Sequence, residues 1–394
     1  MISFDEAIAL IERAVGPLGD EEVPLGEAAG RVLAQPLSAR SAAPRQAVAA
    51  MDGYAVVDAG TRAGIDLTVI GESRAGQGFA GTVAPGQAVR IFTGAPMPDG
   101  ADRCIMQEYA ARDGDRVRFA EGYGPAWHVR AAGSDFAAGD ILLEAGTRLS
   151  PRAMIAAAAA DRAILSVSLQ PRIAIIGTGD ELAAPGEAHL RADAIPESVT
   201  FGVAALAVQA GGRVVHRAIG LDDLPALERA AGDALAAADV VIVTGGASVG
   251  ERDFAKPMFA PHGLELVFAK VGIKPGKPVW LGRAAGKWVI GLPGNPTSAM
   301  VTARLFLLPL LALLQGQALD EVLRWRTLPL AAPLGETGGR ETFVRARWED
   351  EGLVPVSNQD SGAQGALAGA DWLIRCPAGQ GALAAGDLVR ALSF

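Results

Sequence analysis

The stretch Arg172-Ile-Ala-Ile-Ile-Gly-Thr-Gly-Asp-Glu-Leu182 decides the fold, because a short apolar run that ends in glycines is typical of a buried strand and the loop after it. The stretch Asp239-Val-Val-Ile-Val-Thr-Gly-Gly246 repeats this pattern further along the chain. Between the two, the apolar spacing predicts a helix over 197–210, a strand over 213–219 and a helix over 223–237. This alternation favours a mostly parallel, doubly wound α/β sheet, which binds ligands beyond the carboxyl ends of its strands.

Three strings that contain glycine, two of them with proline as well, lie in the same half of the chain, and together they indicate a site for phosphate or another oxyanion. They are Thr244-Gly-Gly-Ala-Ser-Val-Gly250, Lys274-Pro-Gly-Lys-Pro278 and Leu292-Pro-Gly-Asn-Pro-Thr-Ser298. Glycines let backbone N–H groups approach an anion, and the turn between Lys274 and Lys277 brings two ammonium groups toward one ligand. The alternative for each string, taken alone, is a solvated turn or a helix start.

Acidic residues near these loops favour a divalent cation. The first glycine loop lacks the third glycine of a dinucleotide fingerprint and carries Asp180 and Glu181, which would repel a bare pyrophosphate. Two carboxylates suit Mg²⁺, which leaves other coordination positions to phosphate and water. Asp253, after the second glycine loop, is a further candidate metal ligand or a group that orients a base. The alternative at both places is a helix N-terminus stabilised by acidic side chains.

The rest of the chain predicts further domains. A capping box at Ser3 opens an amphipathic helix, and Ser150 opens another. Between them, glycine and proline recur among short apolar runs, which indicates a β-rich module. The predicted domains are an elongated helical connector of residues 1–43 and 131–168, an inserted β-rich domain of 44–130, an α/β domain of 169–320 and a small C-terminal β-domain of 321–394.

Composition excludes several classes of function. The 394 residues carry a formal charge of −9, which argues against general binding to nucleic acid. The two cysteines belong to no zinc-like spacing, and the N-terminus lacks the basic start and apolar stretch of a signal peptide, so a cytoplasmic protein is expected. The apolar segment from Ala299 to Leu314 carries Arg304 and Pro309 and is short for a membrane span, so it is expected to be a buried helix.

Eight motifs along the chain resemble, in their order, those of the MoeA/gephyrin E-domain family of molybdopterin molybdenumtransferases. They are Met51-Asp-Gly-Tyr-Ala55, Phe92-Thr-Gly-Ala-Pro96, Gly133-Ser-Asp135, Ala145-Gly-Thr147, Thr178-Gly-Asp-Glu-Leu182, Gly245-Gly-Ala-Ser-Val-Gly250, Lys274-Pro-Gly-Lys-Pro278 and Leu292-Pro-Gly-Asn-Pro296. The resemblance implies a molybdopterin-binding α/β domain, an elongated homodimer, and a reaction that inserts molybdate into adenylylated molybdopterin with Mg²⁺ and releases AMP. It also implies a molybdopterin adenylyltransferase as a partner and molybdoenzymes or cofactor-modifying proteins as recipients, without nucleic acid or a membrane.

The same resemblance implies a set of functional residues at matching positions. The implied catalytic residues are Asp52, Asp135, Glu181, Asp253 and Lys274. The implied molybdopterin and nucleotide contacts are Thr93, Arg130, Thr178, Gly179, Gly245, Gly246, Ser248, Gly250, Lys270 and Asn295. The implied molybdate contacts are Lys274, Lys277, Pro278, Ser298, Arg345 and Ser361, and the implied metal ligands are Asp180, Glu181, Asp223 and Asp253. Asp52, Thr93, Arg130 and Asp135 are expected to reach the cleft from the partner subunit.

One departure from the family pattern keeps alternatives open. Where the family usually has an Asp-Ser/Thr-Asn string, this chain has Ile195-Pro-Glu-Ser-Val199, so the asparagine is absent and Glu197 and Ser198 are its partial replacements. The second hypothesis is therefore a non-catalytic molybdopterin-binding scaffold or a specialised paralogue. A third, nicotinamide-dependent oxidoreduction, rests on the βαβ alternation alone and is disfavoured by the acidic pair in the first glycine loop.

Overall fold

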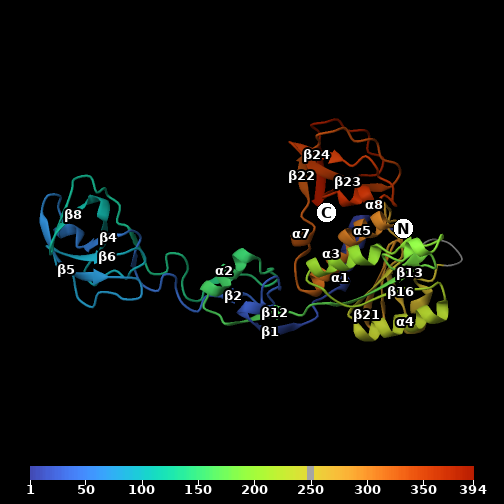
Figure 1. Cartoon of the computed structure of the whole chain (residues 1–394), viewed down its shortest axis with the longest axis horizontal. Helices are drawn as coiled ribbons and strands as arrows, with labels where there is room; N and C mark the ends of the chain where they lie inside the picture. The colour runs from blue at the N-terminus through green and yellow to red at the C-terminus, as the bar shows by residue number, and fades with distance from the viewer. Residues whose placement is uncertain (246–252) are drawn as a thin grey trace.

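The chain is elongated, with a β-rich domain at one end and an α/β domain beside a C-terminal β-domain at the other (Figure 1). The computed structural model describes residues 1–245 and 253–394. A narrow connector, which contains α2 (Pro151–Ala159), joins the two ends (Figure 1). The predicted class, a multidomain protein of α/β and β domains, is confirmed.

The α/β domain is built on a mixed sheet. Across the sheet, the strands are β16 (Arg213–Gly220), β13 (Arg172–Thr178), β17 (Val240–Thr244), β21 (Lys287–Leu292), β20 (Trp280–Ala284) and β18 (Glu265–Phe268). Strands β16, β13, β17 and β21 are parallel, whereas β20 and β18 pair antiparallel. The domain also contains α3 (Val199–Gln209), α4 (Leu224–Ala237), the pair β14 (Leu182–Ala183) and β15 (Ile195–Pro196), and a 3₁₀ helix, Pro257–His262.

Alternation along β13 explains why helices cover both faces of this sheet. Ile173 and Ile175 point to the core that contains α3, while Ala174 and Ile176 point to the core that contains α4. A strand that is buried on both faces must be apolar throughout, as the first quoted stretch is.

The long apolar helix near the C-terminal half of the α/β domain is a core helix, as predicted. It runs through α5 (Pro296–Thr302), a π-type turn (Ala303–Leu307) and α6 (Leu308–Leu314). It is long and apolar enough to cross a membrane, but 83% of its apolar window is buried inside the protein. Arg304 is buried within it and donates to the carbonyls of Ser393 and Val322, at 2.7 and 2.9 Å. Burial lowers the pKa of its guanidinium to about 10, so Arg304 stays charged at neutral pH.

The first helix, α1 (Phe4–Ala14), has the predicted capping box: Ser3 Oγ accepts from the Glu6 amide, and the Glu6 carboxylate accepts from the Ser3 amide. Its predicted place in the connector is wrong. Phe4 and Ile11 lie in the core of the α/β domain, where the Phe4 ring contacts Phe306 at 5.7 Å and Phe343 of the C-terminal domain at 5.3 Å. Its apolar face fixes its position, because that face is buried between two domains and not along the connector.

The connector is more strand than helix. Its strand pairs are β1 (Asp20–Pro24) with β12 (Ile164–Ser168) and β2 (Leu37–Ser38) with β11 (Ile141–Leu143). Ser150 caps α2 as predicted, because its hydroxyl accepts from the Ala153 amide at 3.3 Å.

The β-rich domain is an antiparallel-dominated sheet with a core on each face. In order, its strands are β7 (Arg103–Met106), β4 (Gly53–Val56), β6 (Gln87–Ile91), β5 (Asp66–Ser73), β9 (Arg116–Phe119) and β8 (Ala110–Asp113). The pair β3 (Val48–Ala49) and β10 (Val129–Arg130) lies where the chain enters and leaves the domain.

The C-terminal domain is joined to the α/β domain through a shared sheet. Its strands are β23 (Glu341–Glu349), β25 (Trp372–Cys376), β26 (Leu388–Ser393) and β22 (Arg326–Pro329), with β24 (Gly352–Pro355) also paired to β23. The edge strand next to β23 is β19 (Ile273–Lys274), which belongs to the lysine string of the α/β domain. Two short helices, α7 (Leu319–Val322) and α8 (Gln364–Ala368), complete this part.

An ion network around Asp239, at the amino ends of the parallel strands, is expected to contribute to the stability of the fold. Burial would raise the pKa of the Asp239 carboxyl, but hydrogen bonds from Arg172 at 2.9 and 3.1 Å and from Lys287 at 3.1 Å outweigh it and hold the pKa at about 2. We expect Asp239→Asn to lower the free energy of unfolding at pH 7 by about 1 to 2 kcal/mol, after allowance for solvent screening.

The prediction can be checked by the pH dependence of the free energy of unfolding. A depressed carboxyl pKa stabilises the fold above the unfolded value and loses this effect as pH falls through the folded value. The difference between the two proteins should therefore shrink between about pH 4 and pH 2. Denaturant unfolding of both proteins at pH 7 and pH 3 measures it, and a difference that stays constant would contradict the assignment.

Candidate functional site

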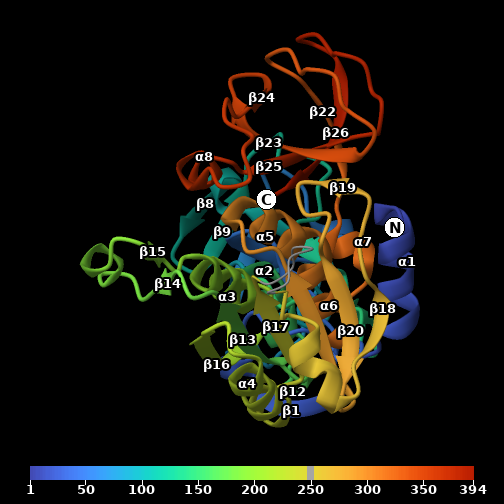
Figure 2. The same cartoon turned by 90° about the vertical axis from the view of Figure 1, so that its right-hand side faces the viewer.

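A cleft of about 510 Å³ opens at the carboxyl ends of the parallel strands β13, β17 and β21. The C-terminal domain lies above the α/β domain, with α5 between them (Figure 2). The residues that line the cleft are Thr178, Gly179, Glu181, Leu182, Ile195, Pro196, Glu197, Ser198, Val199, Asp222, Thr244, Gly245, Pro278, Pro293, Gly294, Asn295, Pro296 and Gln364. The predicted position of the ligand site, beyond the carboxyl ends of the strands, coincides with this cleft.

The glycine loops that form the floor of the cleft touch each other through their backbones. Gly245 has a φ of +92°, and a Cβ at this position would lie 2.4 Å from the Thr178 carbonyl oxygen. A Cβ on Gly294 would lie 3.2 Å from the Gly245 Cα. Such close contact admits no larger side chain at Gly245, which explains why glycine is needed there.

One wall of the cleft is acidic. A Cβ on Gly179 would lie 2.7 Å from a carboxylate oxygen of Glu181, so Glu181 folds back over this glycine at the cleft. Asp180 is exposed, and its carboxylate accepts from the Asp222 amide at 3.0 Å. Asp223, the residue selected from the sequence, begins α4 and does not line the cleft, whereas its neighbour Asp222 does.

Asp253 is half-buried, and its Oδ1 atom has no hydrogen-bond partner among the described residues. Burial raises the pKa of its carboxyl. Gly246, Ser248 and Gly250 lie outside the described residues. Within residues 1–245 and 253–394, no three His, Cys, Asp or Glu side chains gather in a group that could hold a metal ion.

The lysine string places positive charge beside the cleft, and Lys274 and Lys277 are not among the residues that line it. Lys274 and Lys277 are exposed, and neither ammonium group has an ion-pair partner within the described parts of the chain. Gly276 has a φ of +102°, and a Cβ there would lie 2.2 Å from the Thr302 methyl group, so the turn packs directly on α5. Pro278 lines the cleft next to this turn. Two ammonium groups without an ion-pair partner among the described residues, on a turn that packs on α5, suit an oxyanion.

The start of α5 connects the cleft to the C-terminal domain. Asn295 donates its side-chain amide to Ser361 Oγ at 2.9 Å, and the Thr297 amide donates to the Ser361 carbonyl at 3.1 Å. Ser298 is buried in the first turn of the helix. These contacts bring Asn295 and Ser361, which are 66 residues apart in sequence, to one place.

Arg345 is fully buried beside this junction, and its main contacts are structural. Its guanidinium donates to Thr297 Oγ1 at 3.2 Å and to the carbonyls of Asn358 and Asp360 at 3.0 and 3.1 Å. Burial lowers its pKa, although nearby Asp360 acts in the opposite direction. Its Nε atom has no partner among the described residues. Most donors of Arg345 are therefore engaged in holding the loop with Ser361 against α5.

Asp52, directly before β4, and Thr93, after β6, belong to the β-rich domain, which lies at the opposite end of the chain from the α/β domain (Figure 1). Asp52 accepts at Oδ1 from the amide and the hydroxyl of Thr93, at 2.7 and 2.8 Å, and these bonds lower the pKa of its carboxyl. Arg130 and Asp135 are exposed in the segment that leaves the domain. Lys270 is half-buried and does not line the cleft.

The cleft also contains Gln364, which sequence reasoning did not select, and Glu197, which it named only as a partial replacement for the family's asparagine. Gln364 reaches it from α8 of the C-terminal domain, and no pattern in the sequence marks it. Glu197 lines the cleft, but it is buried and accepts from the Thr200 amide at 2.7 Å and from the Thr200 hydroxyl. It therefore caps α3. The spacing of Glu197 and Thr200 across a helix start is the signal that was available.

Comparisons with known proteins agree along the whole chain. Family models match residues 2–160 as "MoeA N-terminal region (domain I and II)", 174–313 as "Probable molybdopterin binding domain" and 327–394 as "MoeA C-terminal region (domain IV)". The molybdopterin molybdenumtransferase of Haemophilus influenzae is 34% identical over 374 residues, which cover 93% of this chain and 90% of that protein. The one of Synechococcus elongatus is 32% identical over 409 residues and covers 100% of both.

A solved structure has the same architecture. The crystal structure of the molybdopterin biosynthesis MoeA protein of Pyrococcus horikoshii OT3 covers 100% of both chains, with a TM-score of 0.86 and 26% identity. With relatives of more than 30% identity matched over nearly their full length, the chain belongs to the MoeA family of molybdopterin molybdenumtransferases.

Proposed function

We propose that this chain inserts molybdate into adenylylated molybdopterin and releases AMP, as a molybdopterin molybdenumtransferase of molybdenum cofactor biosynthesis. The observation that carries the proposal is a cleft with carboxylates on one wall and, beside it, two lysines that have no ion-pair partner among the described residues. An adenylylated pterin presents phosphate charge that a carboxylate-held cation can offset, and molybdate presents oxygens that ammonium groups can bind.

We assign the binding of molybdate to the lysine string, Lys274 to Pro278. Lys274 and Lys277 supply charge, and the turn between them is seated on α5 by Gly276. Ser298 and Ser361 supply hydroxyl groups near the same helix start. Arg345 contributes by holding Ser361 in place, and its Nε is the one guanidinium nitrogen without a partner among the described residues.

The acidic wall is assigned to the phosphate end of the substrate and to Mg²⁺. The ion needs one or two carboxylates and takes its other ligands from phosphate and water, so a three-carboxylate group is not required. Glu181 and Asp222 line the cleft, and the Asp253 oxygen without a partner fits a cation ligand. When bound, Mg²⁺ offsets negative charge at the scissile phosphoanhydride. Glu181 and Asp222 would hold this ion and, through it, orient the phosphate end of the substrate, and no covalent enzyme intermediate is required.

A homodimer completes the proposal. Asp52 and Thr93 lie at the far end of their own chain, so they serve a cleft only when a second chain brings them there. The elongated shape leaves the β-rich domain free for such an exchange. A cytoplasmic adenylyltransferase supplies the substrate, and molybdoenzymes or cofactor-modifying proteins receive the product.

The test is AMP release by the purified protein. We expect AMP to form from adenylylated molybdopterin only when both molybdate and Mg²⁺ are present, and EDTA to stop it. Absence of AMP under these conditions would contradict the transferase proposal.

A non-catalytic scaffold is the second candidate, and the contacts of Glu197 favour it. Its carboxylate is used to cap α3, which leaves Ser198 as the polar replacement for the family's asparagine in the cleft. Tight pterin binding without AMP release would support the scaffold. Replacing Ser198 by Asn then tests whether the asparagine restores turnover.

A further inference from the structure

The loop of residues 270–278, which we call the lysine loop, is held along both edges by other parts of the chain. On one edge, Ile2 pairs with Val271 as a parallel bridge: the Gly272 amide donates to the Ile2 carbonyl at 2.8 Å and the Ile2 amide to the Lys270 carbonyl at 3.4 Å. On the other edge, β19 pairs with the start of β23, with Ile273 opposite Glu341. The N-terminal segment and the C-terminal domain thus lie on opposite sides of the lysine loop.

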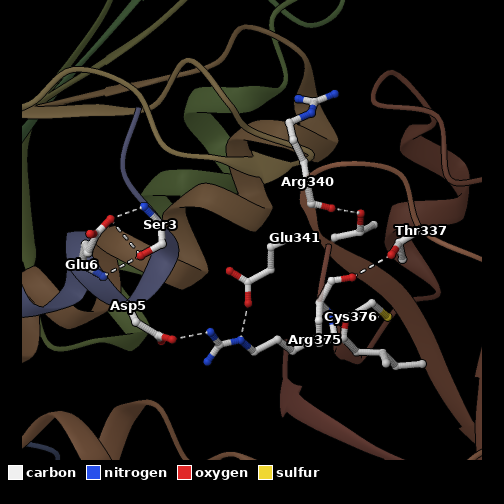
Figure 3. A network of polar contacts seen from close by, with 11 residues as sticks. Ser3, Asp5, Glu6, Thr337, Arg340, Glu341, Arg375 and Cys376 are labelled. Carbon is white, nitrogen blue, oxygen red and sulfur yellow. Dashed lines mark hydrogen bonds and ion pairs between the residues drawn. The ribbon is translucent and has the colours of Figure 1, made fainter. Parts of the chain in front are cut away.

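One side chain connects these two sides. Arg375 of β25 donates from Nη2 to Asp5 of α1 at 2.7 Å and from Nε to Glu341 of β23 at 2.5 Å (Figure 3). The Arg375 and Glu341 side chains are 13% and 17% exposed. The Arg375 guanidinium also lies over the Phe4 ring, 4.9 Å from its centroid. The Arg375 guanidinium is largely buried, bonds two different carboxylates and lies over an aromatic ring, so it is held by more contacts than a single surface ion pair supplies, with the Asp5 carboxylate as the exposed partner.

A cavity lies beside the lysine loop, so packing alone does not fix the loop from this side. The cavity measures about 780 Å³, and Ile2, Ser3, Gly272, Arg340, Glu341 and Arg375 are among the residues that line it. A Cβ on Gly272 would lie 3.4 Å from the Ile2 carbonyl oxygen, so the backbones are close there. A second arginine, Arg340, donates to the Ile273 carbonyl at 3.3 Å. The position of the loop therefore depends on its two edges together with the packing of Val271, Ile273 and Gly276 on the α/β domain.

We propose that Arg375 is a positioning residue for oxyanion binding: by joining Asp5 to Glu341 it sets the spacing of the two edges that hold the lysine loop. This inference rests on the proposed function, because it takes molybdate as the ligand of Lys274 and Lys277. Arg375 with its two partners Asp5 and Glu341, which we call the Arg375 bridge, touches no substrate. It acts through the backbone of the lysine loop and hence on the placement of the two ammonium groups.

The test compares variants of the bridge with a matched control. Arg375→Met removes both arms, and Asp5→Asn removes the negative charge from one arm at a side chain that is 71% exposed, so the second variant is expected to fold even if the first does not. The control is Arg347→Met, which breaks the exposed Arg347–Glu349 ion pair on β23, the strand that also carries Glu341. The readouts are the KM for molybdate, kcat, and amide hydrogen exchange of residues 271–277.

We expect the KM for molybdate to rise about tenfold in Arg375→Met and about threefold in Asp5→Asn, with kcat at saturating molybdate changed by less than about twofold. Amide exchange in the lysine loop should become faster in both variants, and Arg347→Met should match the wild type. An unchanged KM and unchanged exchange in Asp5→Asn and in any folded Arg375→Met protein would overturn the inference. So would a fall in kcat with no change in KM.

A Lys274→Ala variant separates this inference from the proposed function. If Lys274→Ala raises the KM for molybdate and the bridge variants do not, the bridge has no positioning role. If Lys274→Ala itself leaves the KM unchanged, the assignment of molybdate to the lysine loop fails, and the inference fails with it.

Discussion

The double variant Lys274→Ala, Lys277→Ala is expected to lose at least about a hundredfold in affinity for molybdate, because each charge-assisted hydrogen bond to an anion contributes about 1.5 to 3 kcal/mol. Both side chains are exposed and have no ion-pair partner within the described residues, so removing them leaves no buried charge unpaired. The variant should therefore keep the melting temperature of the wild type. Calorimetric titration with molybdate, alongside thermal unfolding, measures both quantities.

The matched control for this variant is Lys287→Met. Lys287 is the first residue of β21, so it lies at the amino ends of the parallel strands, away from the cleft, and it binds Asp239 there. Its loss is expected to lower stability and to leave molybdate affinity unchanged, which is the reverse of the result for the double variant. Molybdate binding that survives loss of both lysines would place the oxyanion elsewhere in the cleft.

The sequence predicts the sheet and the cleft well because their signals are local. Ile173 to Ile176 are buried on alternate faces, as an uninterrupted apolar strand requires, and the glycines after β13 and β17 mark where each strand ends. Parallel pairing then brings these ends together without further information. The need for glycine at positions 245 and 276 is also a local signal, because a crowded position with a positive φ accepts only glycine.

What sequence reasoning missed depends on contacts between distant segments. The capping box of α1 is local and was predicted, but its place against Phe306 and Phe343 depends on packing between domains. The choice between Asp222 and Asp223 depends on the orientation of one turn, which periodicity does not encode. Arg345 was selected as a ligand of molybdate, yet most of its donors are engaged with carbonyls that come close only in the folded C-terminal domain.

Two singly defective variants are expected to restore each other's activity when they form mixed dimers. Glu181→Gln removes a carboxylate from the cleft, and Asp52→Asn removes one at the far end of the chain, where hydrogen bonds from Thr93 keep its pKa low and the group ionised. Each variant alone should lose about a hundredfold or more in the rate of AMP release, which is the usual scale for a lost charge-stabilising group.

The recovery follows from which chain supplies each carboxylate. If a cleft uses its own Glu181 and the partner subunit's Asp52, a mixed dimer holds one intact cleft and one doubly defective cleft. Half of all dimers are mixed after random exchange of equal amounts, so about a quarter of the wild-type rate should return. If each cleft used residues of one chain only, every cleft would carry one defect and nothing would return.

The control mixes Glu181→Gln with Lys274→Ala. Both residues belong to the α/β domain, on the acidic wall and in the lysine loop, so every cleft in every mixed dimer keeps one defect. At molybdate concentrations far below the raised KM of the Lys274→Ala clefts, this mixture should stay inactive although it forms the same dimers, which separates shared clefts from a general stabilising effect of mixing. Recovery in both mixtures would mean that exchange itself restores activity. Recovery in the first mixture alone requires that Asp52 acts across the subunit boundary, which the distance between the two ends of one chain in Figure 1 already favours.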